Sequence, residues 1–128
     1  MVSDTYNFAG KNILIAEDEE TNYFYLETVL KRTGAVLFRA RNGDEAVQVC
    51  KDQPNLDLVL MDIKMPELNG LDATRLIREF NVTLPIIAQT AYALVGERNK
   101  CLSAGCNDYI SKPINRESLL KMITSFIG

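Results

Sequence analysis

Short apolar runs alternate along the whole chain with segments of helical periodicity, and this alternation limits the possible folds more than any other feature. The apolar runs cover residues 13–16, 35–38, 56–61, 84–88 and 109–110. Nearly continuous apolar runs of this length are typical of strands that are covered on both faces, as in a parallel sheet. The segments between the runs repeat apolar residues every three or four positions, which predicts helices.

Apolar stripes and end signals identify the individual helices. The stripes are Tyr23, Leu26 and Leu30; Ala46, Val49 and Cys50; Ala73, Leu76, Ile77 and Phe80; and Leu119, Ile123, Phe126 and Ile127. Asn42 and Asn115 are candidate N-caps, since their side chains accept from free N–H groups of a first turn. The segment before Gly105 carries apolar residues mainly at its ends, Leu94-Val95 and Cys101-Leu102. We therefore expect it to be the least firmly docked helix.

This order of elements predicts an α/β fold, a flavodoxin-like (βα)5 sandwich. Strands that alternate with helices form a parallel sheet with helices on both faces, and right-handed crossovers leave few topologies. The common five-stranded solution has the order 2-1-3-4-5. With 128 residues the chain is long enough for one such domain. We expect this domain at residues 11–128, and an N-terminal arm or linker remnant at residues 1–10.

Composition excludes several function classes. Lys and Arg total 14 against 17 Asp and Glu, so the chain has no basic excess for binding nucleic acid. It contains no histidine, which excludes a histidine-based triad, a histidine-ligated zinc site and an internal phosphohistidine donor. No apolar run approaches the roughly 18 residues of a membrane-spanning helix, and residues 1–10 show no signal pattern. We expect a cytoplasmic location without membrane contact.

The three cysteines are Cys50, Cys101 and Cys106. An odd number without a leader does not indicate a disulfide framework, and Cys101 and Cys106 lack the further ligands of a zinc site. Free thiols are the expected state, and a redox role is the alternative.

Polar residues collect directly after the predicted strands. Glu17 and Asp18 follow the first strand, and Asp62 ends the third. The fourth strand ends in Gln89, Thr90 and Ala91, and the fifth runs into Lys112. In a sheet of this type, ligands bind outside the carboxyl ends of the strands, at the switch point between strands 1 and 3. We therefore expect these side chains to converge at one edge.

The acidic cluster predicts a metal site. Carboxylates in a first helical turn stabilise the helix dipole by about 0.3–1 kcal/mol each, which accounts for Glu19 and Glu20. It does not account for Glu17 and Asp18 close to Asp62, because clustered carboxylates repel unless a cation or protons intervene. Oxygen ligands with water in the remaining positions suit Mg²⁺, and Mn²⁺ is an alternative.

Asp62 could be a ligand, a nucleophile or both, and carboxylate nucleophiles form aspartyl phosphate. Lys112 could pair with an incoming phosphoryl group, and Thr90 could donate its hydroxyl hydrogen to a phosphoryl oxygen. Each residue alone would be an ordinary surface lysine or strand-end hydroxyl. Together, at the ends of the correct strands, they favour phosphoryl chemistry.

Four sequence motifs, in this order and spacing, resemble those of one known protein family. They are ILIAED at residues 13–18, LMDIKMPELNG at 60–70, QTA at 89–91 and DYISKP at 108–113. With these motifs the chain closely resembles the receiver domains of two-component response regulators over about residues 11–127. Asn22, four residues after Asp18, resembles receivers that are fused to sensor histidine kinases.

The resemblance implies a role for each site residue. Asp62 is expected to be the phosphoacceptor. Mg²⁺ is expected to bind Asp62, Asp18, the Lys64 backbone carbonyl and, largely through water, Glu17.

Further positions follow from the same resemblance. Thr90 is expected to be the switch hydroxyl, Tyr109 the switch aromatic and Lys112 the phosphoryl-pairing lysine. Pro113 is expected to follow a cis peptide bond, and Gly70 to relieve the turn into the third helix.

The implied function is a phosphorylation switch. A sensor histidine kinase or a phosphotransfer protein would donate the phosphoryl group from a phosphohistidine. A face from Val95 to about Met122 would then bind a downstream output domain or protein, in a monomer or a phosphorylation-dependent dimer. The chain would not be an enzyme with a separate substrate, although it would catalyse its own phosphotransfer and autodephosphorylation.

Three alternatives compete with this function. A degenerate receiver could serve as a phosphorylation-independent protein-binding module, but this chain keeps all the expected site residues. A flavin binder of the same fold needs a Ser/Thr/Gly-rich loop after the first strand, where this chain has four acids. A hydrolase of the aspartate-nucleophile type would carry its nucleophile at the first strand, and here the candidate lies on the third.

Overall fold

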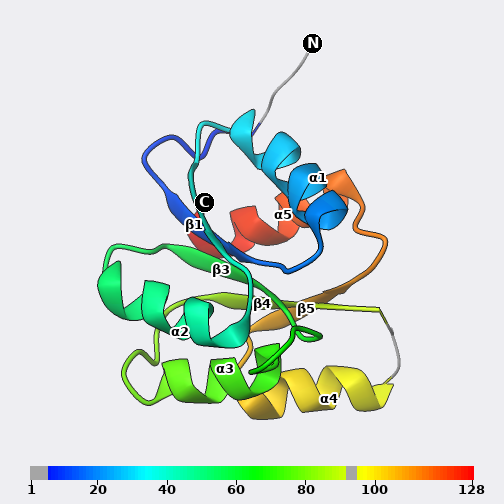
Figure 1. Ribbon diagram of the computed structural model, residues 1–128. Coiled ribbons are helices and arrows are strands. Elements are labelled where there is room, and N and C mark those ends of the chain that lie inside the picture. Colours follow the sequence, from blue (N-terminus) through cyan, green and yellow to red (C-terminus); the bar gives the residue numbers. More distant parts are fainter. Residues whose placement is uncertain (1–5, 92–94) are drawn as a thin grey trace.

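A parallel sheet of five strands forms the centre of the part of the chain that the computed structural model describes, residues 6–91 and 95–128 (Figure 1). The strands are β1 (Asn12–Ala16), β2 (Val36–Ala40), β3 (Leu58–Asp62), β4 (Ile86–Thr90) and β5 (Asp108–Ser111). Their order is β2-β1-β3-β4-β5, and every neighbouring pair is parallel. The predicted fold class and strand order are confirmed.

Helices cover both faces of the sheet, as Figure 1 shows. They are α1 (Glu20–Lys31), α2 (Gly43–Asp52), α3 (Gly70–Arg78), α4 (Val95–Ala104) and α5 (Arg116–Ile127). α1 and α5 lie on one face, and α2, α3 and α4 lie on the other. Leu94, part of the predicted fourth helix, lies outside the described residues. Among the helices described, none has the length and apolar composition that crossing a membrane requires.

Alternate strand residues supply two hydrophobic cores, because successive side chains of a strand point to opposite faces. Leu14, Val59 and Ile86 belong to the α2–α4 core, which lies between the sheet and those three helices. Ile13 and Ile87 belong to the α1/α5 core on the other face. All residues of β3 and β4 are buried, which includes the apolar runs predicted to be covered on both faces and the polar residues that follow them. β2 is an edge strand, and its first residue is exposed.

Four of the strands, β2 to β5, extend one or two residues past their apolar runs toward their carboxyl ends. The fourth strand is predicted to end in residues 89–91, and β4 does continue through Gln89 and Thr90, which are both buried. Leu56 and Leu84 begin their apolar runs and are buried, but they precede the first paired residues of β3 and β4. An apolar run therefore indicates which residues are buried and not where the strand begins and ends. Polar residues that follow such a run can still be paired in the sheet.

Asparagine side chains cap the helices. Asn42 accepts a hydrogen bond from the N–H of Glu45 at 2.8 Å, and Asn115 accepts one from Ser118 at 2.9 Å. Both predicted N-caps are thus confirmed. Asn69 caps α3 in the same way, and α4 ends just before Gly105, whose φ is +113°.

The predicted apolar stripe of α3 is wrong in part. Leu76 and Phe80 are 40% and 43% exposed, and Phe80 lies beyond the end of the helix. The buried face instead includes Thr74, whose hydroxyl donates to the Gly70 carbonyl at 2.8 Å. The helical period permits either face. The close approach of α3 to the sheet favours the face with the small residues.

Residues that precede β1 complete the α1/α5 core. Phe8 is buried in it, and the Phe8 N–H donates to the carbonyl of Thr33 at 2.7 Å. The Tyr6 side chain packs against the same core, and its hydroxyl donates to Glu117 of α5 at 2.5 Å.

Candidate functional site

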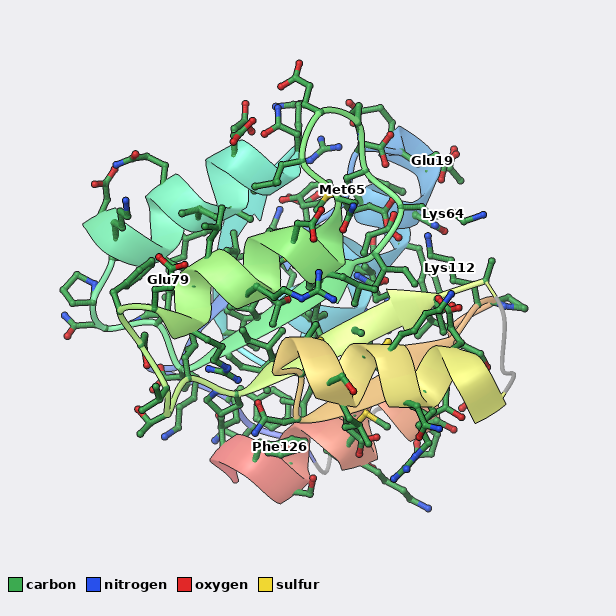
Figure 2. The ribbon with its side chains drawn as sticks, turned by 90° about the horizontal axis from the view of Figure 1, so that it is seen from below. Glu19, Lys64, Met65, Glu79, Lys112 and Phe126 are labelled. Carbon is green, nitrogen blue, oxygen red and sulfur yellow. The ribbon has the colours of Figure 1, made fainter. Side chains whose placement is uncertain are left out.

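The predicted site residues meet at the carboxyl ends of the strands. Glu17 follows β1, Asp62 is the last residue of β3, Thr90 is the last of β4 and Lys112 follows β5. Parallel strands of a sheet all end at the same edge, so one fold feature brings these residues together. Figure 2 shows Glu19, Lys64 and Lys112 at this end of the molecule, with Glu79 and Phe126 away from it.

Three carboxylates form a compact cluster at this edge. One carboxylate oxygen from each of Glu17, Asp18 and Asp62 lies within 4.8 Å of the other two. Glu17 and Asp62 are buried, and Asp18 is exposed. The cluster therefore has two deep members and one open to solvent.

Lys112 contacts both buried acids. Its Nζ lies 3.2 Å from Asp62 Oδ2 and 3.6 Å from Glu17 Oε1. The backbone N–H of Lys112 donates to the carbonyl of Thr90 at 2.7 Å, which ties the residue to the end of β4. The peptide bond between Lys112 and Pro113 is cis. With three carboxylates and one ammonium group, the cluster still has an excess of acidic groups.

The electrostatics of Glu17 fit a divalent cation. Burial raises the pKa of Glu17 from 4.5 to about 7, and the negative charge of Asp62 contributes to the rise while Lys112 opposes it. Glu17 Oε1 has no hydrogen-bond partner among the described residues, although it lies near the Lys112 ammonium. Two carboxylates and a third open to water form the oxygen-rich donor set that Mg²⁺ prefers. The residues present thus fit the metal.

The loop after β3 orients Asp62. The Lys64 N–H donates to Asp62 Oδ1 at 3.1 Å, while Oδ2 faces the Lys112 ammonium. The two carboxylate oxygens therefore have separate partners. The Lys64 carbonyl, which is the further expected metal ligand, belongs to the same loop.

Thr90 and Tyr109 lie on neighbouring strands. Thr90 pairs with Ser111, and Gln89 pairs with Asp62, so Thr90 is one residue further along β4 than the partner of Asp62. The Thr90 side chain is buried, and Tyr109 is half-buried against the α2–α4 core. Thr90 points to the same face as Ala88, which belongs to that core. The predicted switch pair therefore shares one face of the sheet.

Gly70 has a different role from the one expected. The residue with positive φ in the turn is Glu67, at +67°, and Gly70 is instead the first residue of α3. A Cβ at Gly70 would lie 2.2 Å from the Asp62 carbonyl oxygen. Glycine is therefore required for close approach to β3, and not for backbone conformation.

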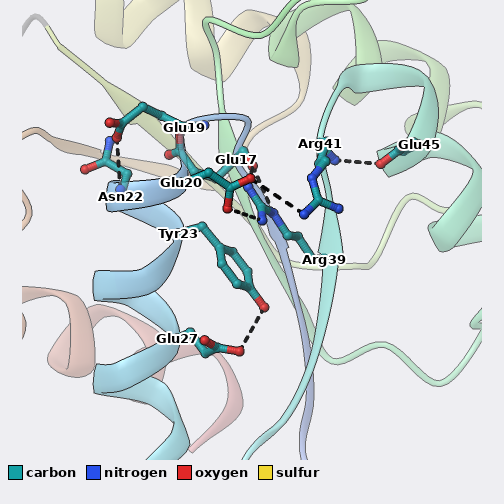
Figure 3. Close-up of polar contacts among 9 residues, drawn as sticks. All are labelled: Glu17, Glu19, Glu20, Asn22, Tyr23, Glu27, Arg39, Arg41 and Glu45. Atoms are coloured by element: carbon teal, nitrogen blue, oxygen red, sulfur yellow. Dashed lines mark hydrogen bonds and ion pairs between the residues drawn. The ribbon is translucent and has the colours of Figure 1, made fainter.

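Sequence reasoning missed two residues beside the site. Arg39 of β2 donates from Nε and Nη2 to the Glu17 carbonyl, at 3.3 and 3.0 Å, as seen in Figure 3. Gln89 is fully buried, and neither of its side-chain amide atoms has a hydrogen-bond partner among the described residues. Arg39 directly follows the predicted run 35–38, and Gln89 stands at the end of the predicted fourth strand. At neither position does the sequence indicate what the polar side chain contacts.

Comparison with known proteins gives the family. Residues 13–124 match the response regulator receiver domain. The polar-differentiation response regulator DivK of Brucella anthropi is 35% identical over 120 residues, which cover 92% of this chain and 97% of that protein. The hybrid signal transduction histidine kinase I of Dictyostelium discoideum is 38% identical over 125 residues. That match covers 91% of this chain but only 7% of the kinase.

Solved structures agree with these relatives. The receiver domain of the Saccharomyces cerevisiae response regulator Ssk1, crystallised with the histidine phosphotransfer protein Ypd1, superposes with a TM-score of 0.88. It is 34% identical, over 94% of this chain and 90% of that one. The receiver domain of the Pseudomonas aeruginosa sensor histidine kinase PA1611 has a magnesium ion in its active site cleft. It gives a TM-score of 0.86 and 40% identity, over 94% and 99% of the two chains. This chain belongs to the response regulator receiver domain family of two-component signalling.

Proposed function

We propose that the chain is a phosphoacceptor receiver that accepts a phosphoryl group on Asp62 in a phosphorelay. The observation that carries the proposal is the contact of Lys112 with two buried members of the acidic cluster, Asp62 and Glu17. A carboxylate nucleophile needs its negative charge balanced while a second anionic group approaches. An ammonium group at 3.2 Å supplies part of that balance.

Each residue has a distinct task in the transfer. The bond from phosphorus to the donor imidazole nitrogen breaks as a bond forms to an Asp62 carboxylate oxygen, and the imidazole takes up a proton. The Lys64 N–H holds the other Asp62 oxygen, and Lys112 pairs with the phosphoryl oxygens. Mg²⁺, or Mn²⁺ in its place, would neutralise charge on the transferred group. Glu17, Asp18, Asp62 and the Lys64 carbonyl would hold it.

The response is a change at the neighbouring strand ends. We assign Thr90 to hydrogen bonding with the new phosphoryl group and Tyr109 to the change in burial that follows. The face from Val95 to about Met122 would then bind an output domain or protein, in a monomer or a phosphorylation-dependent dimer. Both states exist beforehand, and phosphorylation shifts their balance.

The donor is a sensor histidine kinase or a phosphotransfer protein. This assignment is supported by the relatives, which include part of a hybrid histidine kinase and a receiver bound to a histidine phosphotransfer protein. Residues 11–128 would form the receiver and residues 1–10 a preceding arm or linker, of which Tyr6 and Phe8 pack against the α1/α5 core. The chain would act on itself only, by self-catalysed phosphotransfer and autodephosphorylation, and its free cysteines suit a cytoplasmic location.

A degenerate receiver that only binds other proteins is the second candidate, and the site argues against it. Such a chain has no need of a buried carboxyl pair with a lysine between the two groups, in which the pKa of Glu17 is raised to about 7. Burial of these charges costs stability, and phosphoryl transfer explains the cost.

Intact-mass spectrometry after incubation with acetyl phosphate and Mg²⁺ tests the proposal. The wild type gains a phosphoryl adduct, Asp62→Asn gains none, and EDTA prevents the gain in the wild type. Asp57→Asn is the matched control, because Asp57 precedes the same strand at its other end, where it accepts from Asn12 N–H at 2.8 Å. An adduct on Asp62→Asn, or equal labelling with and without EDTA, contradicts the proposal.

A further inference from the structure

Arg39 connects three parts of the chain beside the acidic cluster. It lies on the edge strand β2, and only 12% of its side chain is exposed. Its guanidinium donates twice to the Glu17 carbonyl and once, from Nη1, to Glu20 Oε1 at 2.8 Å. The same group lies over the ring of Tyr23 at 4.1 Å from the ring centroid (Figure 3). Strand β2, the loop after β1 and the first turn of α1 thus meet at one side chain.

These contacts anchor Glu17 on both sides of its backbone. The Glu17 N–H donates to the Ala40 carbonyl at 2.9 Å, and the Glu17 carbonyl accepts both bonds from Arg39. The Glu17 side chain in turn accepts from the Glu19 N–H at 3.2 Å. The backbone of the acidic loop is therefore held from β2.

Asp18 depends most on this anchoring. Its side chain is exposed, and it has no hydrogen-bond or ion-pair partner among the described residues. Its position is set by its neighbours, Glu17 and Glu19, which are both fixed by hydrogen bonds. Loosening of the Glu17 carbonyl would release the one carboxylate of the cluster that has no support of its own.

The guanidinium is the only cationic side-chain group that can make all three contacts at once. It is planar, so two N–H groups can share one acceptor while its face stacks on an aromatic ring. A lysine ammonium is a point charge without that fork. It would keep the attraction to Glu20 and Tyr23 but not the paired bonds to the Glu17 carbonyl.

We propose that Arg39 is a positioning residue for the acidic cluster, and that it sets the affinity of the site for Mg²⁺ through the Glu17 carbonyl. The proposal rests on the metal site of the proposed function. It adds a residue on the edge strand that touches neither the metal position nor the phosphoacceptor. Residues that orient metal ligands typically change metal affinity by about 10–100-fold when they are mutated.

The direction in which Mg²⁺ affinity changes on substitution of Arg39 distinguishes a positioning role from an effect of its charge. A cation near a metal site weakens metal binding by repulsion, so loss of the Arg39 charge alone would tighten it. Loss of positioning weakens it. A lysine at this position keeps the charge and removes the fork, and a methionine removes both.

The experiment compares Arg39→Lys, Arg39→Met and the matched control Arg41→Met. Arg41 also pairs with Glu20, with Nη2 at 3.6 Å, but its side chain is 60% exposed, and among the described residues it has no hydrogen bond or ion pair with Glu17. Isothermal titration calorimetry of each metal-free protein with MgCl₂ gives the dissociation constant, and thermal melting in EDTA gives Tm. We expect both Arg39 variants to bind Mg²⁺ about tenfold more weakly. Arg41→Met stays at the wild-type value.

The outcomes that contradict the proposal are distinct. An Arg39→Lys variant with wild-type Mg²⁺ affinity overturns it, including when its Tm is lowered, because that result shows a purely structural arginine. Tighter binding by Arg39→Met shows a charge effect and also overturns it. If Arg39→Met does not fold, Arg39→Lys decides alone. If the wild type itself does not bind Mg²⁺, the metal site of the proposed function fails, and the role of Arg39 fails with it.

Discussion

The first residue of α3 lies directly against the last residue of β3: a Cβ at Gly70 would sit 2.2 Å from the carbonyl oxygen of Asp62. The helix therefore starts on the backbone of the residue that we assign as phosphoacceptor. Gly70→Ala must push this backbone away. We expect the free energy of unfolding to fall by about 1–3 kcal/mol, as in overpacked cores, when it is measured by urea denaturation.

Gly96 of α4 provides the control for this change. A Cβ there would meet no atom within 4 Å. Alanine is the better helix former by about 1 kcal/mol, so Gly96→Ala keeps or raises stability. Equal effects of the two substitutions would contradict the close approach at Gly70.

The metal-free protein is expected to gain stability as the pH falls from 8 to 6. Burial and the charge of Asp62 raise the pKa of Glu17 from 4.5 to about 7. Between about pH 4.5 and pH 7 the Glu17 carboxyl is protonated in the folded state and ionised in the unfolded chain. The folded state therefore binds one more proton, and lowering the pH through this range favours folding. Urea denaturation in EDTA at several pH values measures the slope.

Glu17→Gln removes the titrating group, and with it the contribution of this residue to the slope. Mg²⁺ binding has the opposite dependence, because protons compete with the metal for the carboxylate. We therefore expect the affinity of the wild type for Mg²⁺ to fall as the pH drops through 7. Equal Mg²⁺ affinity at pH 6 and pH 8 would exclude a shifted Glu17 in the site.

The buried thiols are expected to react slowly. Burial raises the pKa of Cys50 and of Cys106 from 9.0 to about 11. That shift alone leaves about a hundredfold less thiolate, which is the reactive form. Iodoacetamide at pH 8 should therefore leave both residues unmodified in the native protein and alkylate them in guanidinium chloride, as followed by peptide mass spectrometry. Rapid alkylation of Cys50 or Cys106 in the native state would contradict their burial.

Gln89 is a site where stability can be gained. Its buried amide has no hydrogen-bond partner among the described residues, and an unsatisfied buried polar group costs about 1–3 kcal/mol. Gln89→Met keeps the length of the side chain without the amide, so we expect a higher Tm by differential scanning calorimetry. Gln48→Met is the control, because Gln48 is exposed on α2 and donates to Asp52 at 2.9 Å. A gain at position 48 that matched the one at position 89 would remove the argument from burial.

The sequence is sufficient to predict that the site residues lie together, because their proximity depends only on the topology of the sheet. Asp62 and Lys112 are 50 residues apart, yet each stands at the end of a parallel strand, and such ends share one edge. The alternation of apolar runs and helical stripes is enough to establish that topology. The caps at Asn42 and Asn115 are equally local features, since each depends on a residue three positions away.

Contacts between elements carry no such local signal. Arg39 is one polar residue at the end of an apolar run, and its contact with the Glu17 carbonyl depends on how the loop after β1 passes over β2. The sequence predicts the buried face of α3 incorrectly, because Leu76 and Phe80 fit the helical period as well as Thr74 does. Period alone does not show how closely a helix approaches the sheet.

The packing of Tyr6 and Phe8 matters for the engineering of this receiver. The family match starts at residue 13, yet Phe8 is 2% exposed and Tyr6 bonds to Glu117. A chimera joined at the family boundary would remove two aromatic side chains that pack in or against the α1/α5 core. Fusion junctions and proteolytic trimming sites therefore belong upstream of residue 6, so that the transferred domain keeps this packing.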